Sequence, residues 1–387
     1  MITRRDLLWG AGSLLAATAG AALTGYNRTP EPRERPRPVT PPAGSFLVES
    51  GVLRLDRNES PYGPSPAVVE TLKSMTVEDC CRWPEQEAAT LRNAIGRLHH
   101  VAADHVVVGA GSTDIMRVCA SRFLGPGKHL LMAAPGFERI ADYARATGAS
   151  VAEVPLDRLY QQDLQAMRQR VTAATGMVYI ANPFTPTGTM LRRDQMLDFL
   201  EALPKTLPVL VDEAYIEYAR WPGQIDPSLI SQTVRDQRLI VTRTFSKIYG
   251  MPGMRIGYAC AAPATAQRIA LGGTQHDLSA RSLRAATAAL TDPGYVKSIA
   301  RLNEDARQEF FNQADARMLQ PVDSNANFVL LFIDDCLEVA NHFARHGIRV
   351  AGDFPGLAQS IRVTLGTPAQ MREFWRVFDL KRTLRPF

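Results

Sequence analysis

The chain has 387 residues, of which 45% are hydrophobic and 21% are charged, and its formal net charge is +5. Residues 1–45 hold six arginines against three acidic residues, so the remaining chain carries 38 basic and 36 acidic side chains. Length and composition fit a globular protein of one or two domains, and the charge indicates no basic face for nucleic acid.

The first 45 residues predict export rather than folded structure. Arg4 and Arg5 stand in the sequence TRRDLL, before an apolar stretch rich in alanine and glycine. The stretch is too short and too weakly apolar for a comfortable membrane span, and it resembles a twin-arginine (Tat) export signal. We assign residues 1–25 to a Tat-type signal peptide and the proline-rich residues 26–45 to a linker. This implies a periplasmic protein that meets the Tat translocase and keeps no stable membrane anchor; an uncleaved N-terminus is the alternative.

From about residue 104, short apolar runs alternate with helical patterns. Helices are expected at 112–123 and 137–148, and strands at 105–111, 129–135, 150–156, 177–182, 208–215 and 238–246. Apolar runs that are each followed by a crossover helix predict an α/β fold with a mostly parallel sheet covered on both faces. Functional side chains are then expected just beyond the carboxyl ends of the strands.

The C-terminal part predicts a smaller α+β domain. Helices are expected at about 293–319, at 337–347 and from 368, with strands at 326–333, 348–352 and 360–366. We assign residues 46–75 to a segment joining the small domain, 76–285 to the large domain, and 286–387 to the small domain.

The cysteines and histidines show no metal-site pattern. The five cysteines are odd in number and lack CxxC spacing, so neither a disulfide framework nor a zinc site is expected. Free, mostly buried thiols are the expected state. His99 and His100 and the other histidines show no ligand spacing and are expected at the surface.

A glycine-rich turn precedes the helix expected at 112–123. The sequence VVVGAGSTD has Asp114 where a dinucleotide fingerprint needs glycine, which disfavours a nicotinamide dehydrogenase. Backbone N–H groups and the helix dipole still form an anion site, to which Ser112 and Thr113 would add hydroxyls. One phosphate is therefore expected here.

Two later segments suggest the chemistry of a carbonyl cofactor. Lys247 follows Thr244 and Ser246, and Arg255 comes eight residues later. A lysine amine with its pKa lowered can form a Schiff base with a phosphorylated aldehyde, although a surface lysine in a loop is the alternative. Asp212 ends the preceding apolar strand, where an acid would hold a pyridine nitrogen protonated and make the ring an electron sink. Tyr215 would donate to the ring oxygen.

Taken together, these segments resemble the pyridoxal-phosphate (PLP) aminotransferases of fold type I, class I/II, and most closely histidinol-phosphate aminotransferases. The likeness covers roughly residues 50–380, and its specificity lies in the order and spacing of motifs that are weak singly. They are LDRNESPYGPS (55–65), GAGSTD, APGF (134–137), NPFTPTG (182–188), DEAY (212–215), TFSK (244–247), GMRIGY (253–258), ANF (326–328) and IRVTLGT (361–367).

The resemblance implies a role for each matched residue and a homodimer. Lys247, Asp212 and Tyr215 would be catalytic, with Lys247 carrying the Schiff base and the proton of the α-carbon. Phe137 would stack on the ring, and Arg362 and Tyr62 would contact the substrate. The phosphate would be held by Ser112, Thr113, Thr244, Ser246 and Arg255.

Three positions depart from the family pattern. Thr185 stands where an asparagine usually bonds the ring oxygen, and Trp83 replaces a tyrosine that reaches the partner subunit's cofactor phosphate. Ala351 stands where histidinol-phosphate enzymes tend to have an arginine that grips the substrate's phosphate, with Arg349 two residues earlier. This absence, together with export, argues against histidinol phosphate as the substrate.

The leading hypothesis is an exported aminotransferase acting on an amino donor and a 2-oxo acid acceptor. Exported enzymes of this type are associated with transamination of a glutamyl side group in the siderophore pyoverdine. A racemase or decarboxylase on the same scaffold is the second hypothesis. A non-catalytic binding protein with this fold is the third, motivated by Thr185 and Trp83.

Overall fold

The computed structural model describes residues 51–219, 226–274, 277–352 and 354–383. These residues all belong to one compact unit, 38–387, and the expected signal peptide and most of the linker precede it. Both of those segments lie outside the described residues. Within the described ranges, no helix combines the length and apolarity that crossing a bilayer requires.

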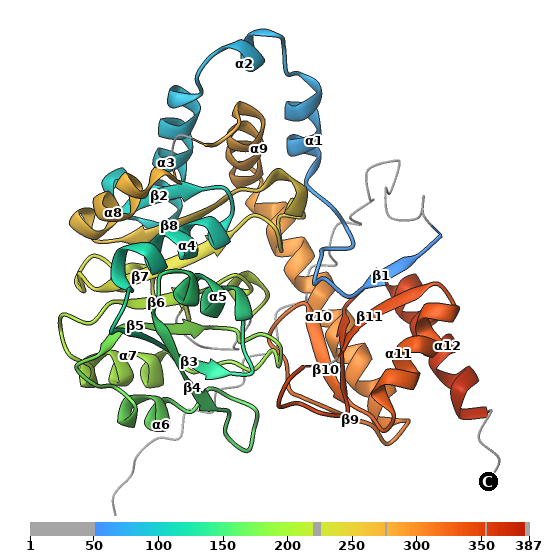
Figure 1. Cartoon of the computed structure of the whole chain (residues 1–387). Helices are drawn as coiled ribbons and strands as arrows, with labels where there is room; N and C mark the ends of the chain where they lie inside the picture. The colour runs from blue at the N-terminus through green and yellow to red at the C-terminus, as the bar shows by residue number, and fades with distance from the viewer. Residues whose placement is uncertain (1–50, 220–225, 275–276, 353, 384–387) are drawn as a thin grey trace, which may run out of the picture. The chain divides into compact units, whose positions relative to one another are not determined.

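The larger sheet has seven strands in the order β2-β8-β7-β6-β5-β3-β4 (Figure 1). Strand β8 pairs antiparallel with β2 and β7, and the other neighbours run parallel, which confirms the mostly parallel sheet. Central strands such as β5 are buried along their whole length, as expected when helices cover both faces. The strands are β2 (Val106–Gly109), β3 (His129–Ala134), β4 (Ser150–Pro155), β5 (Thr175–Ala181), β6 (Val209–Asp212), β7 (Leu239–Thr244) and β8 (Gly257–Ala261).

Helices connect most of these strands. The helix expected at 112–123 is confirmed to the residue as α4. The expected crossover helix between β6 and β7 was wrong for the described part of that connection, which holds only the short 3₁₀ turns η2 (Ile216–Tyr218) and η3 (Ile230–Gln232). The helices are α1 (Pro66–Lys73), α2 (Glu78–Cys81), α3 (Glu85–His99), α4 (Ser112–Phe123), α5 (Glu138–Ala146), α6 (Leu164–Gln169), α7 (Arg193–Ala202), α8 (Pro263–Ile269) and α9 (Ala280–Leu290).

The second sheet has five strands in the order β1-β11-β12-β10-β9. Strand β1 (Leu53–Leu55) pairs parallel with β11, so a segment from early in the chain completes a sheet made mostly of late ones. The later strands are β9 (Gln320–Pro321), β10 (Phe328–Phe332), β11 (Ile348–Gly352) and β12 (Ser360–Thr364), and the helices are α10 (Pro293–Asp315), α11 (Cys336–Arg345) and α12 (Pro368–Thr383).

The two faces of the second sheet differ. An aromatic cluster that includes Phe310, Phe343 and Phe374 packs against one face, where each fully buried ring stabilises the fold by about 1.5–3 kcal/mol. Residues alternate along a strand, so Arg362 in β12 lies on the opposite face from its neighbour Ile361, which belongs to that cluster. That opposite face contributes to the site described below.

The cysteines and histidines differ partly from expectation. All five cysteines are free, but only Cys119 and Cys260 are buried. The expectation of surface histidines was wrong for His105 and His342, which are buried. It was also wrong for His99, which is half-buried with its Nε2 2.8 Å from the Tyr258 hydroxyl, because α3 packs against the large core. No cluster of three metal-ligating side chains occurs within the described ranges.

Candidate active site

Lys247 lies in the turn that follows β7. The Thr244 hydroxyl accepts a hydrogen bond from the Ser246 N–H at 3.0 Å, which stabilises the turn immediately before the lysine. The half-buried Lys247 donates from Nζ to the backbone carbonyls of Arg57 and Asn58, both at 3.1 Å. The amine is therefore held at the carboxyl end of β7 by a segment that follows β1, rather than pointing into solvent.

Asp212 ends β6 and is 7% exposed. Its Oδ2 accepts a hydrogen bond from the Tyr179 hydroxyl at 3.3 Å, and its Oδ1 accepts one from the Thr242 hydroxyl at 3.3 Å. Burial raises the pKa of Asp212 to about 6, because desolvation disfavours the charged form, while these hydroxyls and the Ala214 N–H oppose the rise. The carboxyl is thus mostly ionised at neutral pH, and a cation beside it would favour that form further.

Asn58 connects Tyr215 to the second sheet. Its Nδ2 donates to the Tyr215 hydroxyl oxygen at 3.0 Å, and its Oδ1 accepts from the Thr364 hydroxyl at 3.3 Å. Asn58 is buried and has a positive φ of 54°, a conformation that is uncommon outside glycine and that asparagine tolerates better than most residues. Sequence reasoning missed this role, although Asn58 belongs to the motif LDRNESPYGPS.

An anion site forms where α4 begins. The Arg255 guanidinium donates from Nη2 to the Thr113 hydroxyl and from Nη1 to the Ser246 hydroxyl, each at 3.4 Å. Gly111 precedes the helix with a φ of 88°, and a Cβ atom there would collide with the Arg255 guanidinium. Helix N–H groups, two hydroxyls and an arginine therefore converge, with the buried Ser112 at the start of the helix, as a phosphate group requires.

Arg362 lies on the other side of the site. Its Nη1 donates to the Thr185 hydroxyl at 3.3 Å and its Nη2 to the Asp56 carbonyl at 3.1 Å. The rings of Phe328 and Phe354 each lie 5.3 Å from the guanidinium carbon, within the range of cation–π attraction. Burial lowers the pKa of Arg362, and its buried Nε–H finds no acceptor within the described part of the chain. A carboxylate would satisfy such a donor.

The remaining predicted residues differ in their surroundings. Phe137 is half-buried just before α5 and packs against the large core. Tyr62 is buried, which raises the pKa of its hydroxyl, and its carbonyl accepts from the Tyr295 hydroxyl at 3.2 Å. Trp83 lies between α2 and α3 with 83% of its surface exposed, so it stands apart from the contacts described above. Its suggested role toward a partner subunit stays a prediction.

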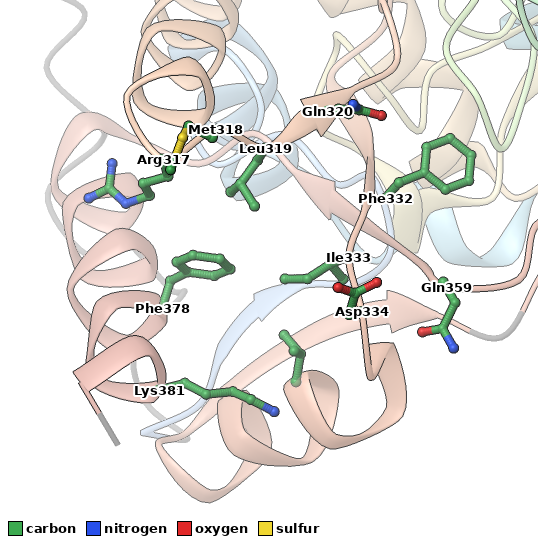
Figure 2. Close-up of a pocket in the computed structure, with 11 residues that line it drawn as sticks. Arg317, Met318, Leu319, Gln320, Phe332, Ile333, Asp334, Gln359, Phe378 and Lys381 are labelled. Atoms are coloured by element: carbon green, nitrogen blue, oxygen red, sulfur yellow. The ribbon is translucent and has the colours of Figure 1, made fainter. Parts of the chain in front are cut away.

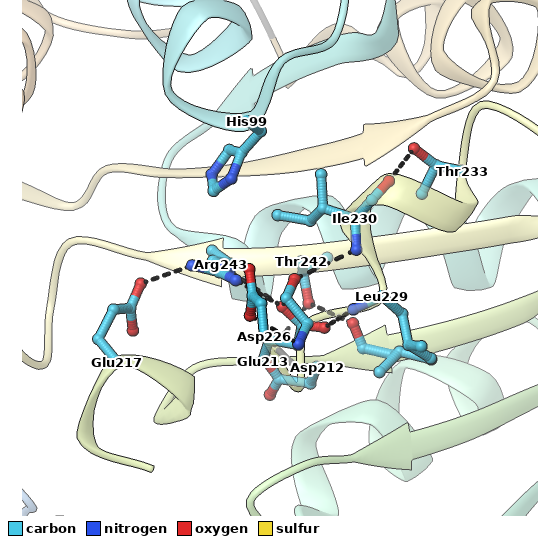
Figure 3. Close-up of polar contacts among 12 residues, drawn as sticks. His99, Asp212, Glu213, Glu217, Asp226, Leu229, Ile230, Thr233, Thr242 and Arg243 are labelled. Atoms are coloured by element: carbon cyan, nitrogen blue, oxygen red, sulfur yellow. Dashed lines mark hydrogen bonds and ion pairs between the residues drawn. The ribbon is translucent and has the colours of Figure 1, made fainter. Parts of the chain in front are cut away.

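A buried ion cluster supports the turn between Asp212 and Tyr215 (Figure 3). Glu213 Oε2 accepts from the Ser228 hydroxyl at 2.7 Å and from Arg243 Nε at 3.0 Å, and its Oε1 accepts from the Leu229 N–H at 2.7 Å. Arg243 also donates from Nη1 to Glu217 at 3.2 Å. Because Arg243 contacts both carboxylates, neither Glu213 nor Glu217 is buried without a cationic partner. Sequence reasoning did not identify it.

A cavity of about 600 Å³ lies away from these residues, beside α12 and β10 (Figure 2). Its wall combines apolar side chains such as Leu319, Val339 and Phe378 with polar groups, among which Arg317 is paired with Asp379. None of the predicted catalytic or cofactor-binding residues lines it. The convergent chemistry around Lys247, rather than this hollow, marks the candidate active site.

The chain is similar to known aminotransferases over most of its length. The family model for aminotransferase class I and II matches residues 50–378. Histidinol-phosphate aminotransferase 2 of Ralstonia nicotianae is 32% identical over 353 residues, which cover 89% of this chain and 93% of the relative. Histidinol-phosphate aminotransferase of Caldicellulosiruptor saccharolyticus is 31% identical over 325 residues, covering 84% of this chain and 90% of the relative.

A solved structure is similar over nearly the same length. The crystal structure of histidinol-phosphate aminotransferase from Sinorhizobium meliloti in complex with pyridoxal-5'-phosphate superposes with a TM-score of 0.80 at 25% identity. The match covers 94% of this chain and 100% of that one.

Proposed function

Since the chain belongs to the class I and II aminotransferases and is a PLP-dependent enzyme of fold type I, we propose that Lys247, Asp212 and Tyr215 are its catalytic residues. The observation that carries this proposal is the hydrogen-bonded group around Asn58. Asn58 bonds to the Lys247 amine through its carbonyl and to the Tyr215 hydroxyl through its side chain. The ends of β6 and β7 and the segment after β1 therefore meet at one place.

The residues present fit the cofactor. PLP, when bound, supplies an electron sink that stabilises negative charge on the substrate's α-carbon. The anionic Asp212 suits a protonated ring nitrogen, and Arg255 with Thr113 and Ser246 suits the phosphate. Tyr215 receives a hydrogen bond from Asn58, which leaves its own hydroxyl proton for the ring oxygen. Lys247 is the base that moves the α-carbon proton, and Thr185 contacts Arg362 beside the same site.

For the substrate, we propose an amine other than histidinol phosphate, although the relatives above bear that name. Ala351 in β11 is the direct cross-strand partner of Arg362 in β12, so both side chains lie on one face of the sheet. At that place histidinol-phosphate enzymes tend to have a second cation, whereas this chain has a methyl group. Arg349 lies on the same face two residues earlier and is exposed. Arg362, assisted by Tyr62, would then bind one carboxylate.

For location and assembly, we propose Tat-dependent export to the periplasm and a homodimer. The support is the Arg4-Arg5 signal and the proline-rich linker, together with the resemblance to dimeric enzymes. An exported enzyme would act on an exported metabolite, and a glutamyl side group of a siderophore such as pyoverdine fits a site with one carboxylate-binding arginine. The acceptor would be a 2-oxo acid.

An amine-donor screen tests this proposal. The purified full chain, loaded with PLP, would be mixed with amino acids, glutamyl peptides or histidinol phosphate, and the cofactor's absorbance would be followed before 2-oxoglutarate is added. We expect glutamyl donors to convert the cofactor and histidinol phosphate to convert it poorly, and Ala351→Arg to improve histidinol phosphate specifically.

Each alternative has its own outcome in this screen. If histidinol phosphate is the best donor, the substrate proposal is wrong while the enzyme class stands. Loss of α-deuterium from a donor without conversion indicates a racemase, and release of carbon dioxide indicates a decarboxylase. A PLP-loaded protein that reacts with none of the donors supports the hypothesis of a non-catalytic binding protein.

A further inference from the structure

Tyr179, in the strand next to β6, contacts the carboxyl group of Asp212 in the candidate active site. It lies in β5, which runs parallel to β6, and the strand register places Ala181 beside Asp212. Tyr179 is two residues earlier and therefore lies on the same face as Ala181. Its side chain is 1% exposed, and its hydroxyl oxygen is 3.3 Å from Oδ2 of Asp212.

The direction of this hydrogen bond follows from chemistry. An ionised carboxylate only accepts hydrogen bonds, and a phenol has one proton to donate. Burial, the charge of Asp212 and this hydrogen bond keep the pKa of Tyr179 well above its ordinary value, so the hydroxyl stays protonated through the neutral range. Tyr179 is therefore a permanent donor to Asp212.

The hydrogen bond from Tyr179 is one of two that hydroxyl groups donate to the carboxylate oxygens of Asp212. The Thr242 hydroxyl, from β7, is 3.3 Å from the other carboxylate oxygen of Asp212. Each strand flanking β6 thus supplies one neutral hydroxyl. Two other titratable groups act on this pair. Glu213, which is paired with Arg243, acts electrostatically on Asp212, and Tyr215 acts on Tyr179.

We propose that Tyr179 is a positioning residue that keeps the Asp212 carboxylate ionised and fixes the orientation of its Oδ2. The inference rests on the proposed role of Asp212 toward the cofactor's ring nitrogen. A donor to a carboxylate stabilises the anion and lowers its affinity for a proton. With Tyr179 in place, a proton shared between Asp212 and a pyridine nitrogen stays on the nitrogen. Without Tyr179, the proton lies on the carboxyl of Asp212 in a larger fraction of the molecules.

The test uses the full chain loaded with PLP that carries ¹⁵N in its ring, because the ¹⁵N chemical shift reports whether that nitrogen is protonated. Tyr179→Phe removes one hydroxyl. We expect it to shift the proton equilibrium between the ring nitrogen and Asp212 about tenfold toward the carboxyl, roughly one pKa unit, as for a hydrogen bond to a charged group. The matched control is Tyr258→Phe, which removes an equally buried hydroxyl that contacts His99 instead.

The outcomes separate this inference from the proposed function. Asp212→Asn should abolish ring protonation; if it does not, the role proposed for Asp212 fails. If Asp212→Asn has that effect but Tyr179→Phe gives the wild-type shift, the inference about Tyr179 is overturned. Should Tyr179→Phe fold poorly, 3-fluorotyrosine at position 179 keeps the shape while making a stronger donor. It should keep the ring nitrogen protonated at least as fully as tyrosine does, and a ¹⁵N shift toward the deprotonated nitrogen would refute the inference.

Discussion

Replacing Arg243 by methionine should destabilise the fold through the two carboxylates that it neutralises. Arg243 is 7% exposed and lies 2.9 Å from Glu213 and 3.2 Å from Glu217. Removing one partner of a buried ion pair typically costs about 3–5 kcal/mol, because a charge stays buried without compensation. Glu213 keeps its hydrogen bonds from Ser228 and Leu229, so we expect the free energy of unfolding to fall by about 3–4 kcal/mol.

The loss of unfolding free energy caused by Arg243→Met should become smaller as the pH falls. Burial raises the pKa of Glu217 and Arg243 opposes this, so removing Arg243 raises that pKa further. A carboxyl whose pKa is higher in the folded than in the unfolded state binds a proton more tightly when folded, so its cost is present at neutral pH and disappears on acidification. The deficit of Arg243→Met relative to wild type should therefore shrink between about pH 8 and about pH 5.

Urea denaturation at both pH values, followed by circular dichroism, measures this deficit. The control is Arg376→Met, which breaks the exposed pair between Arg376 and Glu373 and should cost about 1 kcal/mol or less. A deficit for Arg243→Met as small as that of the control, or one that stays constant with pH, would refute the reasoning. The assay needs no cofactor, so its result is independent of the proposed function.

Three further predictions concern the site. Borohydride treatment of the PLP-loaded protein should fix the cofactor covalently on Lys247, as seen by peptide mass spectrometry. The variant Lys247→Ala should lose both the adduct and the activity. The control Lys205→Ala, which removes an exposed lysine paired with Glu201, should lose neither. Arg255→Ala removes a charged donor from the anion site and should weaken PLP binding about 10–100-fold in a fluorescence titration; unchanged affinity would place the phosphate elsewhere. Asn58→Ala removes the donor to Tyr215 and should lower kcat by about tenfold with the protein still folded by circular dichroism; an unaltered kcat would show that this contact is dispensable.

The sequence predicted those parts of the site that depend on local pattern and on strand topology. Asp212 and Lys247 end or follow neighbouring parallel strands, so their proximity follows from the general property that parallel strands present their carboxyl ends at one edge. The helix at 112–123 was predicted to the residue because a glycine turn starts it and its apolar face repeats clearly. Arg255 and Thr113 were expected at one phosphate and do contact each other.

The parts that were missed depend on contacts between distant segments. The contact between Asn58 and Tyr215 joins residues 157 positions apart, and the contact between His99 and Tyr258 spans 159. No periodicity in a single sequence encodes such a pairing. Strand β8 was missed because its residues, GYACA, contain little of the β-branched character that identified the other strands, and its pairing with both β2 and β7 determines its conformation.

The parallel pairing of β1 with β11 has a consequence for how the protein matures. Asn58, three residues after β1, needs Thr364 in β12 before its side chain is fixed, and these residues are 306 positions apart. Asn58, Asp212 and Lys247 are all synthesised before Thr364, so the Asn58 side chain cannot make this contact until β12 has been added to the chain. One hydrogen bond of the candidate active site can therefore form only after nearly the whole chain has been synthesised, and a chain truncated before β12 would lack it.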